Sequence, residues 1–178
     1  MTKSSRSGRS IEVVPVTADR WDDYNSFFAE HKPDCYCRWP RLAPMTFKPG
    51  DPTNRDAVCD PITSGHCPGL LALRDGRPVG WCAVAPQDEY PQYPQPEPGS
   101  WGIACITVSE RGLGIGRELV RAAVALAADN GATTIDGPPP WWKAGDDARR
   151  SATIHVLETN GFDQVGKGER MPILRRHL

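Results

Sequence analysis

Three glycines at alternate positions, Gly112, Gly114 and Gly116, are the residues whose spacing most directly suggests chemistry. They follow a compact apolar run, residues 101–106, and precede an Ala-rich stretch, residues 115–128, with the three-to-four-residue periodicity of an amphipathic helix. Glycines at a helix start leave the backbone open to an outside group, and the first helical N–H groups point at that group with the positive end of the helix dipole behind them. The pattern predicts a strand, a glycine turn and a helix that bind an anion, with phosphate as the expected ligand.

Two familiar glycine loops match poorly. A P-loop requires Gly-Lys-Ser/Thr after its second glycine, and this chain has Ile115, Gly116 and Arg117 there, which excludes that family. The dinucleotide fingerprint requires glycine at Arg117 and belongs to the first βα unit, whereas this turn comes past the middle of the chain. Asp136 lies at a suitable distance to bind a ribose, but one acid is weak support. A turn without any ligand is the plainer alternative, although three glycines cost on the order of 1 kcal/mol each relative to alanine in a helix.

A third glycine loop fits better. Residues 111–116, R-G-L-G-I-G, resemble the Q/R-x-x-G-x-G/A motif of the GCN5-related N-acetyltransferase (GNAT) family. The resemblance spans residues 11–175, and N-G-F at residues 160–162 is similar to the family's L-Y-E-K-x-G-F ending. Residues 35–39 and 79–86 resemble a bacterial subgroup with largely unassigned substrates. The resemblance implies an α/β (α+β) fold with a mixed, mostly antiparallel sheet of about seven strands and about four helices.

The resemblance also implies a donor and a reaction. Acetyl-CoA would be the acyl donor, with its pyrophosphate on the glycine turn, and no metal would take part. The acceptor would be the primary amine of a small molecule. A non-catalytic acyl-CoA-binding or regulatory module and a protein N-acetyltransferase remain as alternatives. The positions carried over to the donor site are Cys105, Ile106, Arg111, Gly112, Leu113, Gly114, Ile115, Gly116 and Arg117.

Direct transfer needs a hydrogen-bond donor for the thioester carbonyl and a route for the proton of the amine. A backbone N–H near residues 105–106, where the motif strand would splay from its neighbour, could supply the first. An alkylamine is mostly charged at neutral pH, so a base or a water chain assists the second. Asp88, Glu89 and Tyr90, in the proline-rich loop 86–99, are the candidates for base and substrate contact, although ordinary solvated loop charges are the plainer interpretation.

The leaving thiolate has no assigned acid. Many family members carry a tyrosine four residues before the glycine of the final motif, and this chain has Leu157 there. His155 is two residues away, about 200° around a helix, so we expect it to face elsewhere. Cys105 could be an acyl-accepting nucleophile, but an apolar strand without an adjacent histidine favours a buried, inert thiol.

The remaining pattern gives the other elements. Pro15 indicates an edge strand, since proline cannot donate to a ladder, and Asp75-Gly76 is a favoured hairpin centre. Aromatic residues share one face of the stretch 21–28, after a helix cap at Thr17, and core packing is their expected role. The expected strands are 11–16, 70–73, 79–85, 101–106, 133–136, 162–166 and 170–174, and the further helices are 54–59 and 149–159.

Length and composition indicate the number of domains and the expected partners and location. The chain has 178 residues and a net charge of −1, which suits one domain, residues 11–178, after a disordered start, residues 1–10. The charge balance favours neither a nucleic-acid partner nor a membrane, and without a signal peptide or long apolar run we expect a cytoplasmic protein. Trp141 and Trp142 cannot both face inward on one strand, which leaves open the interpretation that they are exposed contacts for a substrate or for a second subunit, as in a homodimer.

Six cysteines are expected to be reduced thiols. A zinc site is an alternative, but C-x-C is not the usual knuckle and no second close pair completes it. Its possible ligands are Cys35, Cys37, Cys59, His66 and Cys67.

Overall fold

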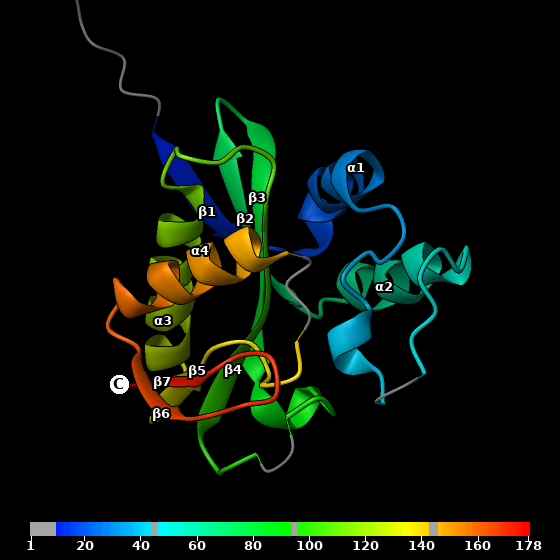
Figure 1. Ribbon diagram of the computed structural model, residues 1–178. Helices are drawn as coiled ribbons and strands as arrows, with labels where there is room; N and C mark the ends of the chain where they lie inside the picture. Colours follow the sequence, from blue (N-terminus) through cyan, green and yellow to red (C-terminus); the bar gives the residue numbers. More distant parts are fainter. Residues whose placement is uncertain (1–9, 44–45, 94–95, 143–145) are drawn as a thin grey trace, which may run out of the picture.

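The computed structural model describes residues 10–43, 46–93, 96–142 and 146–178. The expected disordered start therefore lies almost wholly outside the described residues. The chain forms a seven-stranded sheet in the order β1-β2-β3-β4-β5-β7-β6, with helices on both faces (Figure 1). The elements are β1 (Ile11–Pro15), α1 (Trp21–His31), α2 (Thr53–Thr63), β2 (Gly69–Arg74), β3 (Arg77–Pro86), β4 (Ser100–Val108), α3 (Ile115–Asp129), β5 (Thr134–Asp136), α4 (Asp147–Glu158), β6 (Asp163–Gly166) and β7 (Ile173–His177).

The predicted fold class is confirmed. Every neighbouring pair in the sheet is antiparallel except β4 and β5, which run parallel on either side of the crossover helix α3. Pro15 lies on the edge strand, as expected. The β2–β3 turn places Asp75 and Gly76 at φ 53° and 74°, which is the left-handed pair of a type I′ hairpin turn.

Several boundaries differ from the sequence expectation. Helix α2 extends to Thr63, past Pro61, because the N–H groups of Ser64 and His66 continue the turn by donating to the carbonyls of Asp60 and Pro61. Strand β7 begins at Ile173 rather than at residue 170, because residues 170 and 171 both donate their N–H groups to the carbonyl of Pro140 instead.

Two further corrections concern short turns. The loop 86–99 contains one turn of 3-10 helix, Gln87–Glu89, in the stretch between Pro86 and Pro91. The first helix is also preceded by a 3-10 turn, Ala18–Arg20, and the Thr17 hydroxyl donates to the Asp19 carboxylate rather than capping the helix.

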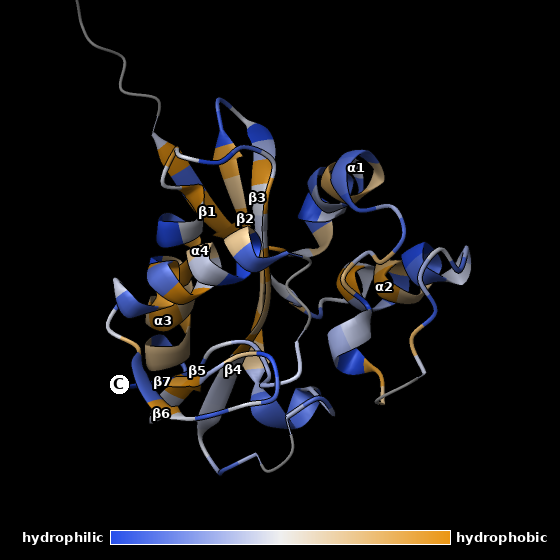
Figure 2. Cartoon of the chain, viewed as in Figure 1, coloured by the Kyte–Doolittle hydropathy of each residue, from blue (hydrophilic) through white to orange (hydrophobic). Residues whose placement is uncertain are grey.

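Each face of the sheet carries its own hydrophobic core. On one face α3 packs closely on β3, since a Cβ at Gly80 would lie 2.6 Å from a methyl carbon of Ile115. On the other face the aromatic residues Tyr24, Phe27 and Phe28 of α1 pack around Trp81, which confirms their expected core role. Figure 2 shows hydrophobic residues concentrated on the strands and along α3, with polar residues at the outer turns.

The sheet opens at its centre. Strands β4 and β5 pair over three residues, from Ser100 opposite Thr134 to Gly102 opposite Asp136, and then β5 ends while β4 continues to Val108. One backbone edge of β4 from residue 103 onward therefore has no strand partner in the described chain.

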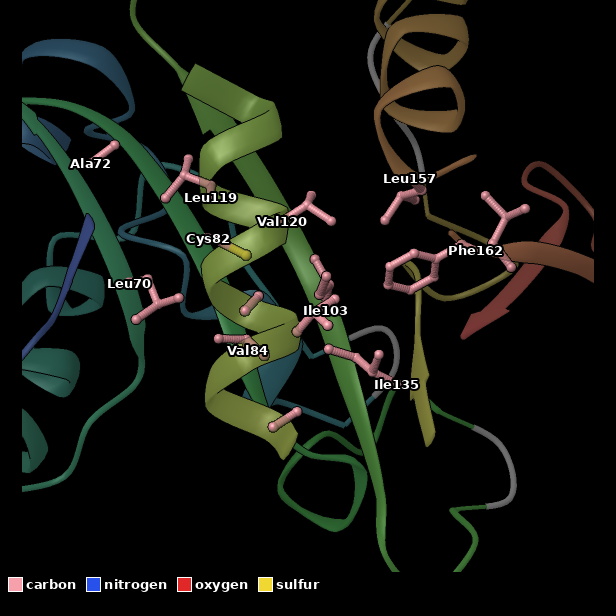
Figure 3. Close-up of a cluster of buried hydrophobic side chains, with 14 of the residues drawn as sticks. Leu70, Ala72, Cys82, Val84, Ile103, Leu119, Val120, Ile135, Leu157 and Phe162 are labelled. Atoms are coloured by element: carbon pink, nitrogen blue, oxygen red, sulfur yellow. The ribbon is translucent and has the colours of Figure 1, made fainter. Parts of the chain in front are cut away.

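A substitution at Leu157 tests the hydrophobic core on the α3 face of the sheet. Its side chain is fully buried beside Phe162 (Figure 3), and its Cδ1 would lie 3.0 Å from a Cβ built on Gly137. We expect Leu157→Ala to lower the free energy of unfolding by about 2–5 kcal/mol, because the truncation leaves a cavity that the surroundings fill only in part.

Leu113→Ala is the matched control, since Leu113 is 45% exposed and its truncation should cost less than about 0.5 kcal/mol. Urea denaturation monitored by tryptophan fluorescence measures both. Equal losses for the two variants would contradict the core position of Leu157.

Candidate functional site

The glycine turn lies at the junction of β4 and α3. Gly112 and Gly114 have φ angles of 78° and 75°, which favour glycine, and a Cβ at either position would meet no atom within 4 Å. The first α3 hydrogen bond runs from the Glu118 N–H to the Gly114 carbonyl, so the amides of residues 115–117 have no acceptor within the helix. The turn is thus an open cradle of N–H groups at a helix start.

A cavity of about 360 Å³ opens beside this turn. Its walls come from the end of β4, the turn, the start of α3 and the facing side of α4. Arg111, Arg117 and Arg149 contribute positive charge, whereas Glu110, the one acid on the wall, is already paired with Arg74 through a 2.6 Å contact. The cavity therefore favours an anionic ligand.

Arg149 lines this cavity although the sequence did not predict it as a site residue. It reaches the wall because α4 returns over α3, and the Asp146 carboxylate fixes the start of α4 by accepting the Arg149 N–H at 2.7 Å. Thr153 and Val156 follow on the same face of the helix. The N-cap pattern could have located the helix start, but no local signal indicates that it faces the turn.

Most of the predicted donor-site residues line this cavity, and two do not. Leu113 projects into solvent, and Cys105 lies with the core on the opposite face of the sheet. The predicted residues on the wall are Ile106, Arg111, Gly112, Gly114, Ile115, Gly116 and Arg117.

A β-bulge explains the position of Cys105. Ala83 pairs with Cys105 and Val84 with Ile103, so Ala104 is an extra residue in β4. As a result Ala104 and Cys105 both contact the α1 core, while Ile106 returns to the α3 side. The bulge lies just beyond the point where β4 and β5 part.

The Cys105 thiol belongs to a small group of thiols on the α1 face. A hydrogen bond from the Cys37 thiol lowers the pKa of Cys105, whereas burial raises the pKa of Cys37. Burial also raises the pKa of Cys35 to about 11. Cys105 is half-buried rather than fully enclosed, and the described residues contain no cluster of three His, Cys, Asp or Glu side chains that could hold a metal ion.

The structure does not bring Asp88, Glu89 or Tyr90 to the donor cavity. The loop 86–99 lies at the opposite end of β4 from the glycine turn (Figure 1). Asp88 is exposed, and Tyr90 is buried. Glu89 lies 3.3 Å from Arg41 and 3.4 Å from His66. Their catalytic role stays a prediction.

Other sequence candidates have structural partners. The Asp136 carboxylate accepts two hydrogen bonds from Arg175, at 2.7 and 2.9 Å, and a third from Gln87 at 2.9 Å, so it is engaged inside the protein. Trp142 is not an exposed contact, because it is buried against Met171, whereas the half-buried Trp141 donates to Gln92.

The last helix supplies no titratable group at the family's usual acid position. Leu157 is buried in the core, and His155 is exposed, whereas Thr153 and Val156 face the donor cavity. The periodicity of α4 explains this, because residues three apart share a face and residues two apart do not.

A model of the acetyltransferase (GNAT) family matches residues 17–137, which is more than half of the chain. The chain belongs to the GNAT family. Its family therefore identifies it as an acetyltransferase. The sheet, the crossover helix and the glycine turn agree with the fold that the sequence resemblance predicted. No curated protein matched the sequence closely enough to count as a relative.

Solved structures agree on the fold. A GCN5-related N-acetyltransferase from Kribbella flavida is 18% identical, with a TM-score of 0.61 over 97% of this chain and 100% of that one. An aminoglycoside N-acetyltransferase in complex with CoA is 13% identical, with a TM-score of 0.62 over 94% and 95%. A protein from Salmonella typhimurium with its cofactor acetyl-CoA is 14% identical, with a TM-score of 0.51 over 94% of both chains. Among the described helices, none has the length and apolar character that a membrane span requires.

The thiol group provides a test of the bulge geometry. Near neutral pH a lowered pKa gives Cys105 a larger thiolate fraction than Cys35, whose pKa is raised to about 11. Because both side chains are half-buried, we expect iodoacetamide to alkylate Cys105 faster than Cys35. Peptide mapping by mass spectrometry measures both rates, with the urea-unfolded chain as the control in which the two react alike. Faster labelling of Cys35 in the folded protein would contradict the Cys37–Cys105 hydrogen bond.

Proposed function

We propose that this protein transfers the acetyl group of acetyl-CoA to the primary amine of a small molecule. The open glycine cradle surrounded by three arginines is the observation that carries the proposal. A pyrophosphate needs many hydrogen-bond donors and positive charge, and the free amides of residues 115–117 together with Arg111, Arg117 and Arg149 supply both. The residues present therefore fit acetyl-CoA.

Acetyl-CoA supplies an activated thioester, and the chain has to position that group and its acceptor. The unpaired edge of β4 beyond Gly102 offers backbone N–H groups to the carbonyl oxygen, where negative charge develops. As the N–C bond forms, the C–S bond breaks. The ammonium gives up two protons in the net reaction, one of which ends on the departing thiolate and the other in solvent.

The proton acceptor remains a proposal among the sequence candidates. Glu89 is the candidate among them that contacts two residues of a cavity, because its partners Arg41 and His66 line a pocket on the α1 face of the sheet. A water chain from this pocket to the amine would suffice, since the base need only accept a proton from a bound water.

A small acceptor fits the dimensions of the α1 face. The pocket there has a volume of about 290 Å³, which suits a metabolite better than a polypeptide. Structural neighbours include enzymes named for aminoglycoside and polyamine acceptors, as well as a ribosomal-protein-alanine N-acetyltransferase. A protein acceptor is thus the second candidate, and a non-catalytic acyl-CoA module is the third, favoured by the buried Leu157 at the usual acid position. We also propose a cytoplasmic location, which the six free thiols support.

A substitution in the glycine cradle should weaken acetyl-CoA binding. Gly114→Asp places a carboxylate beside the amides that would hold the pyrophosphate, so we expect at least a hundredfold weaker acetyl-CoA binding by calorimetry, on the order of 3 kcal/mol. Gly131→Asp is the matched control, since Gly131 also has a positive φ, of 76°, and open surroundings but lies at the other end of α3. Unchanged affinity in Gly114→Asp would refute the donor site.

The same titration tests Arg149. Arg149→Gln should weaken binding by about tenfold, the loss of one charge-assisted contact. Arg150→Gln removes an exposed charge from the next position of α4 and should leave the affinity unchanged. Equal effects of the two substitutions would show that only the overall charge matters.

A thiol-release assay over a panel of amines tests the catalytic part of the proposal. An enzyme liberates CoA at a rate that depends on the added amine, and we expect at least one small amine to raise the rate well above hydrolysis. Stimulation by peptides alone would favour the protein acceptor. Acetyl-CoA binding without any amine-dependent release would identify the chain as a binding module.

A further inference from the structure

The α1 face of the sheet contains a pocket whose mostly apolar wall carries two arginines, Arg38 and Arg41. It lies between α1, α2 and the segment that joins them, whereas the donor cavity lies on the side of α3 and α4 (Figure 1). Its polar and sulfur-bearing lining residues are Tyr24, Cys37, Arg38, Arg41 and His66.

Arg41 is held in a half-buried position, with 23% of its side chain exposed. Its guanidinium carbon lies 4.8 Å from the centre of the Tyr90 ring, and one of its terminal nitrogens donates to Glu89 at 3.3 Å and to the Pro68 carbonyl at 3.4 Å. Its Nε is buried, and no described residue accepts a hydrogen bond from it. That Nε is closed off from the pocket, so an acceptor from outside the chain can meet Arg41 only at the exposed part of its side chain.

Arg38 adds a second positive charge with neutral partners. Its terminal nitrogen contacts the Thr53 hydroxyl and the Asn54 side-chain oxygen, both at 3.3 Å, and no carboxylate of the described residues lies within ion-pair distance of it. Glu89, which also contacts His66, is the one acid in contact with the pocket's cationic side chains. Two guanidinium groups against one carboxylate leave an excess of about one positive charge.

One wall of the pocket adjoins the core that contains the bulge of β4. Cys37 forms part of that wall and packs in the same hydrophobic core as Cys105, which lies just past the point where β4 and β5 part. Tyr36 and Cys37 hold consecutive left-handed φ angles of 45° and 51°, and the Tyr24 hydroxyl secures this conformation by donating to the Tyr36 carbonyl. Non-glycine residues in this region cost roughly 1 kcal/mol or more each, a strain that concentrates at functional sites.

We propose that this pocket binds a carboxylate on the acceptor, so that the substrates are amines that also carry a carboxylate, such as amino acids or their derivatives. The inference rests on the proposed acetyl transfer and narrows its substrate class. A monoanion matches the single excess charge, and the planar forks of Arg38 and Arg41 suit a carboxylate. The carboxylate anchors the acceptor at the arginines, and the amine extends past Cys37 toward β4.

Pairs of amines that differ only in a carboxylate provide the test. Tyrosine with tyramine, lysine with cadaverine, and arginine with agmatine are compared by thiol release with saturating acetyl-CoA. We expect the carboxylated member of the best pair to have a kcat/KM at least about tenfold higher, mainly through a lower KM, because a charge-assisted contact is worth roughly that factor. Preference for the decarboxylated member overturns the inference but leaves acetyl transfer intact. Absence of release with every amine overturns the proposed function itself.

Arg38→Gln tests whether the carboxylate binds at these arginines. It should raise the KM of the carboxylated amine about tenfold, while the values for its decarboxylated partner and the affinity for acetyl-CoA stay unchanged. Arg41→Gln should also raise the KM of the carboxylated amine; it changes the surroundings of Glu89 as well, so only the ratio within the pair is compared. Thermal denaturation checks that this variant still folds. Arg150→Gln serves as the charge control. An unchanged ratio within the pair in folded Arg38→Gln and Arg41→Gln proteins contradicts a carboxylate site at these arginines.

Discussion

The early parting of β4 from β5 is the constraint on which the donor side of this protein depends. Two adjacent parallel strands would normally satisfy each other's backbone groups along their whole length. Here the pairing stops after Gly102, and no strand of the described residues covers this edge of β4 beyond that point, in the middle of a sheet where unpaired polar groups are costly. A carbonyl compound lying in the opening would satisfy them, and the glycine turn beyond the end of the strand adds further unpaired N–H groups. These unpaired groups thus run from the opening between β4 and β5 to the glycine turn, and a ligand that pairs with them would lie along this line.

The two faces of the sheet would hold different substrates. The bulge at Ala104 reverses the alternation of β4, which sends Cys105 toward α1 and Ile106 toward α3. A donor held on the α3 side and an acceptor held on the α1 side would therefore meet at adjacent residues of one strand. Each face is closely packed in its own way: the first through the approach of α3 to Gly80, the second through the aromatic residues around Trp81.

The sequence predicted the local features well. Glycine spacing, helix periodicity and the Asp-Gly hairpin depend on neighbours in the chain, and each appears where it was expected. Features that join distant segments were missed: Arg149 enters the donor cavity through the packing of α4 on α3, and Arg41 meets Glu89 through a contact between residues 48 positions apart. Trp142 was misplaced for the same reason, because its partner Met171 comes from the last loop. No local pattern encodes such pairings.

The position of β7 has a consequence for how the protein acquires its donor cavity. β7 follows the other six strands in sequence, yet it lies between β5 and β6, and its Arg175 holds the Asp136 carboxylate at the end of β5. Strand β5 is three residues long and has only β4 and β7 as neighbours, so it gains its second partner through a loop closure of nearly forty residues. Because β5 is complete only when β7 has paired with it, we expect the opening between β4 and β5 to form late in folding.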